Sequence, residues 1–211
     1  IGLVMFFCPA VVFLGLFAAS KLGLTTSRVQ VPLSHVAIDG EEIPIPLQGK
    51  VTEGKGWVLR NSKGQYTLTL DGLKAGSLER KTPALEIQGD LTLVLKKGTE
   101  SELLSADAAL KKGAGTLTIR GEGSLRLQGE TALEGEWKEE TLNQDEPSAL
   151  RIEGGKLVFT GEETALYEDT VELAGGEIQI QCLNGKGTGI RAHTLDDRHF
   201  SGSLEMEESE E

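Results

Sequence analysis

The sequence predicts an all-β protein whose body is a short parallel β-helix, or solenoid, preceded by one apolar N-terminal helix. A doublet of a small and an aliphatic residue recurs at spacings of 25, 23, 33 and 24 residues, at Ala84-Leu85, Ala109-Leu110, Ala132-Leu133, Ala165-Leu166 and Gly189-Ile190. A period of roughly 20 to 30 residues is typical of solenoids, in which each coil buries its apolar face against the next coil. The chain also has 27 glycines, and no long amphipathic helical pattern follows residue 24. These features favour short strands joined by tight turns.

The first segment, residues 1–23, is predicted to be a transmembrane anchor. Ile1 to Ala19 carry no charged side chain, and Lys21 ends the apolar run. About 20 apolar residues suffice to cross a bilayer as a helix. A cleaved secretory signal peptide, with Ala18-Ala19-Ser20 as the cleavage site, is the alternative. Either interpretation predicts a body outside the cytoplasm, and the anchor predicts a single-pass protein of the cell membrane.

Residues 24–56 are predicted to form a stalk and the first strands. The run Ile43-Pro44-Ile45-Pro46-Leu47 must be extended, because proline fixes its own φ and restricts the residue before it. The solenoid body is predicted over residues 57–206, starting with strands at Trp57–Leu59 and Tyr66–Leu70. An acidic tail, residues 207–211, follows.

Within the body, strands with alternating apolar and polar residues are separated by glycine corners. Leu91–Leu95 follows Gly89-Asp90, and Leu157-Val158-Phe159 follows Gly154-Gly155. The alternation predicts one buried and one wet side for each strand. A stack of antiparallel hairpins, as in the open jellyrolls of membrane-anchored lipid carriers, is the competing architecture. The long spacing between Ala132 and Ala165 indicates a charged insertion at residues 136–147, which solenoids often project from a binding face.

Charge excludes one class of partner. The chain has 21 Lys and Arg against 33 Asp and Glu, a formal net charge of −12. Nucleic-acid binding needs a basic surface, so no nucleic acid is expected. The acidic surface is compatible with neutral sugars, cationic partners or calcium. The two cysteines, Cys8 and Cys182, do not suggest a disulfide framework.

Several strings of the body resemble a bacterial family. They are Tyr66-Thr-Leu-Thr-Leu-Asp-Gly-Leu73, Ile87-Gln-Gly-Asp-Leu-Thr-Leu-Val-Leu95, Gly115-Thr-Leu-Thr-Ile-Arg-Gly-Glu-Gly-Ser-Leu125, Leu150-Arg-Ile-Glu-Gly-Gly-Lys-Leu157 and Gly187-Thr-Gly-Ile-Arg-Ala192. Over residues 57–193 the chain is similar to clostridial cell-surface proteins that contain a carbohydrate-binding domain. The resemblance implies a right-handed parallel β-helix, shaped like pectate lyases, that binds plant cell-wall polysaccharide without cleaving it. It also implies bound calcium.

Candidate ligand-binding residues are Trp137, Arg126 and Arg151. Trp137 lies at the edge of the charged insertion, and a flat aromatic ring can cover the apolar face of a sugar. Arg126 and Arg151 fall at outward strand positions, where a guanidinium could pair with a uronate carboxylate or with a neighbouring glutamate. Asp196 and Asp197 are the candidate calcium ligands, because adjacent carboxylates in a loop can supply oxygen ligands.

Three functions are compatible with these features. The first is a membrane-tethered, non-catalytic module that binds cell-wall polysaccharide, with calcium as a possible cofactor. The second is a structural or scaffolding protein of the cell envelope that has no sugar ligand. The third is a calcium-dependent polysaccharide lyase, in which Arg198 would act as the base. One architecture can host all three, so the fold alone does not choose among them.

Overall fold

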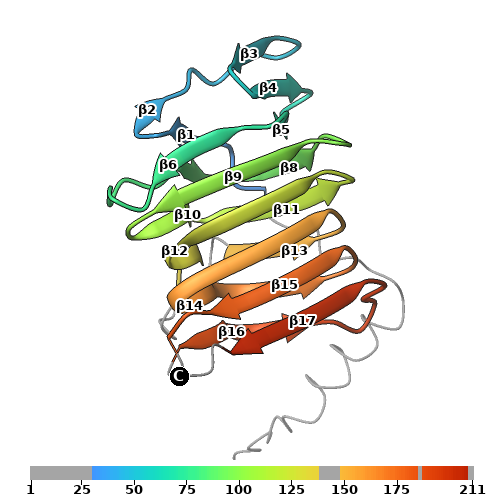
Figure 1. Cartoon of the computed structure of the whole chain (residues 1–211). Helices are drawn as coiled ribbons and strands as arrows, with labels where there is room; N and C mark the ends of the chain where they lie inside the picture. Colours follow the sequence, from blue (N-terminus) through green and yellow to red (C-terminus); the bar gives the residue numbers. More distant parts are fainter. Residues whose placement is uncertain (1–29, 138–147, 185–186, 209–211) are drawn as a thin grey trace, which may run out of the picture.

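The computed structural model describes residues 30–137, 148–184 and 187–208. All regular elements in these ranges are strands, stacked one above another into a solenoid of about five turns (Figure 1). The all-β prediction is therefore confirmed. The strands are β1 (His35–Ile38), β2 (Glu41–Glu42), β3 (Val51–Gly54), β4 (Trp57–Ser62), β5 (Gln65–Leu70), β6 (Lys74–Ser77), β7 (Leu85–Gln88), β8 (Leu91–Leu95), β9 (Glu100–Ser105), β10 (Ala108–Lys112), β11 (Gly115–Gly121), β12 (Ser124–Glu134), β13 (Ser148–Ile152), β14 (Lys156–Leu173), β15 (Glu177–Cys182), β16 (Thr188–Asp196) and β17 (Ser203–Glu208).

Parallel pairing arranges these strands in three columns, which we call the first, second and third faces. The first face contains β7, β10, the end of β12, the middle of β14 and the start of β16. The second contains β5, β8, β11, β13 and the ends of β14 and β16. The third contains β6, β9, the starts of β12 and β14, β15 and β17. Each coil visits the three faces in this order.

The repeated doublet occupies the same place in every coil. Leu85, Leu110, Leu133, Leu166 and Ile190 are aligned partners on successive strands of the first face. The four leucines are at most 1% exposed, so like side chains stack on like inside the coil. This register confirms a parallel solenoid and shows that the hairpin alternative is wrong for the body. That the coils wind in a right-handed sense stays a prediction.

Antiparallel pairing is confined to the N-terminal end. β4 pairs antiparallel with both β3 and β5, and β1 pairs antiparallel with β7. Parallel pairing begins with β5, which pairs with β8, so β4 still belongs to the antiparallel end of the sheet. The start of the body at residue 57 stays a prediction. β1 covers the edge of β7, which removes a free strand edge from this end of the stack.

A column of glycines marks the turn from the second face to the third. Gly123, Gly155, Gly176 and Gly202 each immediately precede a third-face strand. A Cβ on Gly202 would lie 1.9 Å from the carbonyl oxygen of Gly176, and one on Gly123 would lie 2.3 Å from that of Lys96. At these two corners the backbones of consecutive coils approach too closely for any side chain, which explains the glycine there.

Two predicted segments lie partly or wholly outside the described residues. The anchor, residues 1–23, lies outside them, as does most of the insertion, residues 138–147. Within the described ranges, no helix has the length and apolar character needed to span a membrane. Glu207 and Glu208, at the start of the predicted acidic tail, belong to β17 and align with Gln181 and Cys182 of β15. The bounds of the tail stay a prediction.

Candidate functional site

An aromatic and cationic cluster lies on the outside of the first face, near its border with the second. We call Trp137, Tyr167, Arg191 and His193 the ring cluster. The Trp137 ring stacks on Tyr167, with centroids 5.0 Å apart and planes at 27°. It also contacts the His193 ring, with the two ring centroids 3.7 Å apart and the ring planes at 40°. The Arg191 guanidinium carbon lies 5.4 Å from the centroids of both Trp137 and Tyr167. The four side chains form one contiguous surface.

Register explains why Tyr167 and Arg191 meet. Each follows its doublet by one residue, and they are aligned partners on β14 and β16. In earlier coils the same outward column holds Glu86, Lys111 and Glu134, which supply charges of alternating sign. Lys111 and Glu134 form an ion pair at 3.6 Å. The column thus changes from paired charges to an aromatic ring and a cation where the ring cluster begins.

The path of the chain after β12 places Trp137. The Gly135 amide donates a hydrogen bond to the Tyr167 carbonyl oxygen at 2.6 Å, which holds the end of β12 against β14. A Cβ at position 135 would lie 2.2 Å from Oε2 of Glu168, so any larger residue here would displace that carboxylate from its contact with Lys112. Two residues later, Trp137 lies against Tyr167. The start of the insertion is therefore anchored by backbone contacts.

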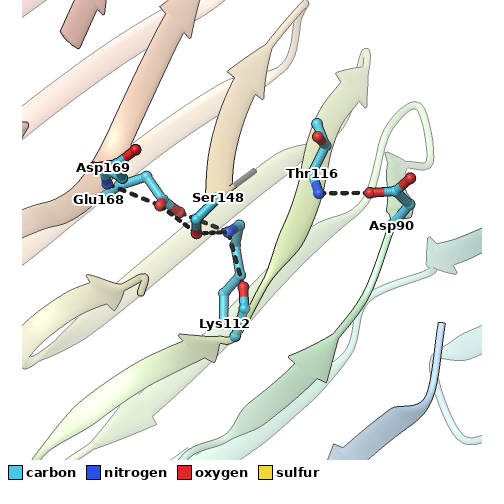
Figure 2. Close-up of polar contacts among 7 residues, drawn as sticks. Asp90, Lys112, Thr116, Ser148, Glu168 and Asp169 are labelled. Carbon is cyan, nitrogen blue, oxygen red and sulfur yellow. Dashed lines mark hydrogen bonds and ion pairs between the residues drawn. The ribbon is translucent and has the colours of Figure 1, made fainter. Parts of the chain in front are cut away.

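A buried polar network lies behind this anchor (Figure 2). Lys112 Nζ is 2.9 Å from Glu168 Oε2, and neither side chain is accessible to solvent. The ammonium also donates to Ser148 Oγ at 2.7 Å, and that hydroxyl donates to Glu168 Oε1 at 2.8 Å. Burial lowers the pKa of Lys112 and raises the pKa of Glu168, while their mutual attraction opposes both shifts. The network joins strands on both sides of the insertion.

Only one of the two basic side chains in the ring cluster has a carboxylate partner among the described residues. His193 Nδ1 lies 2.7 Å from Asp169 Oδ1, so the imidazole has a carboxylate partner. Among the described residues, Arg191 has no carboxylate within ion-pair distance, and its contacts are the two aromatic rings. An aromatic surface beside an unpaired guanidinium can stack against a sugar ring and donate hydrogen bonds to its oxygens.

The structure distributes the predicted ligand-binding residues over the molecule. Trp137 belongs to the ring cluster. Arg126 lies on the third face, where Nη1 is 3.6 Å from Glu102 and Nη2 donates to Gln128 at 2.6 Å. Arg151 lies on the second face, 2.9 Å from Glu153 and 3.6 Å from Glu172. The two arginines are not brought together, and both engage neighbouring carboxylates. Their roles in ligand binding stay predictions.

The predicted calcium ligands lie at the last turn. The Arg198 guanidinium binds both carboxylate oxygens of Asp196, at 2.9 and 2.5 Å. These hydrogen bonds lower the pKa of Asp196 well below its usual value. The Asp197 carbonyl accepts a hydrogen bond from Phe200. In the described part of the chain, no three His, Cys, Asp or Glu side chains gather as metal ligands. This donor set does not fit calcium well, because Asp196 already has a cationic partner; calcium binding stays a prediction.

Tyr167, Arg191 and His193 are not among the ligand-binding residues that the sequence predicts. His193 lies in β16, two residues after Arg191. Tyr167 and Arg191 follow the fourth and fifth doublets directly, so aligning the doublets places them side by side. His193 can be placed two residues further on. Trp137 has no equivalent in the other coils, and only the structure shows its contact with the other three.

The structure is a parallel β-solenoid that carries an aromatic and cationic cluster on the outside of its coils. A family model described as "carbohydrate-binding domain-containing protein" matches residues 34–209. The chain belongs to this family, which confirms the resemblance drawn from its strand and glycine motifs. No curated protein and no solved structure gives a significant match.

Proposed function

We propose that this protein is a non-catalytic module that binds a polysaccharide on the outside of the solenoid, at the ring cluster. Membership of the carbohydrate-binding family supports a sugar ligand. The observation that carries the choice of site is the stack of Trp137 on Tyr167, with Arg191 lying against both rings. Aromatic and arginine side chains commonly dominate binding energy, because they combine a large apolar area with directed hydrogen bonds.

The geometry gives less support to the lyase alternative. Its proposed base, Arg198, is held by Asp196, and this hydrogen bond raises the pKa of a guanidinium that is already rarely deprotonated. A base must give up its proton readily near the working pH. The Asp196–Arg198 pair instead resembles a structural ion pair at the last turn.

We further propose that the natural ligand is a cell-wall polysaccharide and that the module acts at the cell surface. The support is the uncharged run Ile1 to Ala19, which fits either a membrane anchor or a secretory signal. The family resemblance adds support for a cell-wall ligand. Extraction of membrane fractions with detergent, compared with a high-salt wash, would test the tether.

Affinity electrophoresis tests the binding proposal. Gels would contain hydroxyethyl cellulose, galactomannan or polygalacturonate, each with and without calcium. We expect at least one polysaccharide to retard the protein. Trp137→Ala should raise the apparent dissociation constant for that polysaccharide at least about tenfold. Arg191→Ala should raise it as well. Arg80→Ala is the matched control, because Arg80 is an exposed arginine whose guanidinium pairs with Asp39 at the N-terminal end, outside the ring cluster.

Two outcomes would reject the proposal. In the first, no polysaccharide retards the wild-type protein, which would favour a scaffolding role. In the second, Trp137→Ala and Arg191→Ala bind as well as Arg80→Ala, although all three variants unfold at the wild-type temperature.

A further inference from the structure

A separate groove lies over the second face at the N-terminal end of the stack. It has a volume of about 640 Å³ and crosses β5, β8 and β11. Its floor is formed by Thr67, Thr92 and Thr118, which are aligned partners on these three strands. The ring cluster belongs to the coils of β14 and β16 on the first face, so the two features occupy different faces and different coils.

The uncharged threonines of the floor differ in charge from the residues aligned with them on the later strands of the second face. After Thr118 the same outward column continues with Arg151, Glu172 and Asp196, all of them charged. The groove therefore coincides with the part of this column that has no charge. Among the described residues, the hydroxyls of the three threonines make no hydrogen bond. Each can donate and accept one.

One wall of the groove is held firmly in place. The Asp90 carboxylate accepts hydrogen bonds from the Thr116 amide at 2.7 Å and from the Val31 amide at 3.1 Å (Figure 2 shows the first). The Asp90 amide in turn donates to the Val31 carbonyl at 2.8 Å. Gly89, with φ +106°, lets the wall approach, since a Cβ there would lie 2.3 Å from the Pro32 carbonyl oxygen. The groove is thus a preformed surface.

We propose that this groove is a second subsite for an uncharged stretch of glycan. This inference rests on the proposed function, and it adds a site and a ligand class to it. Neutral sugar units present hydroxyls that complement the free threonine hydroxyls, and the exposed Arg120, which lines the same groove, can donate further hydrogen bonds to them. Neighbouring strands lie about 4.8 Å apart, so the three threonines span about 10 Å. That length suits a short run of sugars.

Two subsites on one module predict that affinity depends on ligand length. A chain that reaches both the groove and the ring cluster gains effective concentration at the second contact, whereas a short oligosaccharide does not. Hydroxyethyl cellulose and galactomannan would therefore bind more tightly per molecule than their short oligosaccharides.

Removing hydroxyls without changing shape tests the groove directly. The test uses affinity gels with the two neutral polysaccharides. There Thr92→Val/Thr118→Val should raise the apparent dissociation constant about tenfold, as expected for two lost hydrogen bonds. Thr92→Lys should raise it further by filling the groove. Thr69→Val is the matched control: Thr69 is aligned with Val94, so valine already occupies that ladder, and Thr69 does not line the groove. Its retardation should equal that of the wild type.

The outcomes separate this inference from the proposed function. If Trp137→Ala weakens retardation but the double valine variant and Thr92→Lys bind like Thr69→Val, the groove is not a subsite and the proposed function stands. If the groove variants lose affinity only for polygalacturonate, the assignment to an uncharged glycan is wrong. If no polysaccharide retards the wild-type protein, both proposals fail. Equal unfolding temperatures of all variants ensure that lost binding reflects the groove.

Discussion

Lys112 and Glu168 show how one pair of residues can secure an irregular part of a repeating fold. Lys112 is aligned with Ile87 of the previous coil, so a charged side chain occupies a place that is aliphatic one coil earlier. Its charge is balanced by Glu168 at 2.9 Å, in a space where neither side chain reaches solvent. Because an isolated buried charge is costly, each residue requires the other.

Removing one partner of this pair should therefore destabilise the protein strongly. We expect Lys112→Met to lower the free energy of unfolding by about 3–5 kcal/mol, because it leaves the Glu168 carboxylate buried and unpaired. Lys112→Met/Glu168→Leu should recover part of the loss. The adjacent Lys111→Met removes an exposed pair with Glu134 and should cost about 1 kcal/mol or less. Urea unfolding measures all three, and equal effects at positions 111 and 112 would contradict the argument.

At the last turn, Arg198 controls the ionisation of Asp196. Its hydrogen bonds lower the pKa of Asp196, so the carboxylate stays ionised to a lower pH than in the unfolded chain. The sign follows from linkage: the stabilising contribution is present above the unfolded pKa of about 3.9 and is lost as the pH falls through the folded pKa. We expect Arg198→Ala to raise the pKa of Asp196 toward its usual value in an NMR titration of the side-chain carboxyl carbon. An unchanged titration would show that another group holds this carboxylate.

At the scale of the strands, the leucine column of the first face carries much of the packing. Leu110 has aligned leucine partners on both sides, Leu85 and Leu133, and none of the three is exposed. Leu110→Ala should lower the free energy of unfolding by about 2–5 kcal/mol, because rigid strands on both sides prevent the cavity from closing. Leu78→Ala, at a position 46% exposed, should cost far less. Thermal and urea unfolding would show the contrast; similar losses at both positions would argue against the column as the main source of stability.

The same column explains what could be predicted from the sequence. The doublets repeat without change of chemistry, so their alignment predicts parallel register, buried leucines and outward neighbours such as Tyr167 and Arg191. Lys112 and Glu168 are 56 positions apart, with the insertion between them, and no periodic pattern connects them. Trp137 belongs to a segment that other coils lack. The groove likewise depends on the path of Val31 and its neighbours outside the repeat, and only the fold shows where that segment lies.

Over the whole molecule, the two ends of the stack are finished differently. At the N-terminal end, β1 covers β7. At the other end, β16 and β17 each pair with a strand on one side only within the described ranges. The difference is visible along the third face: Leu157 and Ile178 are 1% and 2% exposed, but their aligned partner Leu204 is 38% exposed. In a quasi-one-dimensional stack, such an end coil lacks half of its neighbour contacts.

This asymmetry predicts a gradient of local stability along the axis. Amide hydrogens of β10 and β11, which have partner strands on both sides, should exchange slowest, and those of β17 should exchange fastest among the solenoid strands. Hydrogen–deuterium exchange with peptide-level mass spectrometry measures the gradient. Met206→Thr, at a position 58% exposed, should leave exchange in β10 unchanged, whereas Leu110→Ala should accelerate exchange in several coils at once. Equal protection of β10 and β17 would mean that the coils open together, and that the stack behaves as one cooperative unit.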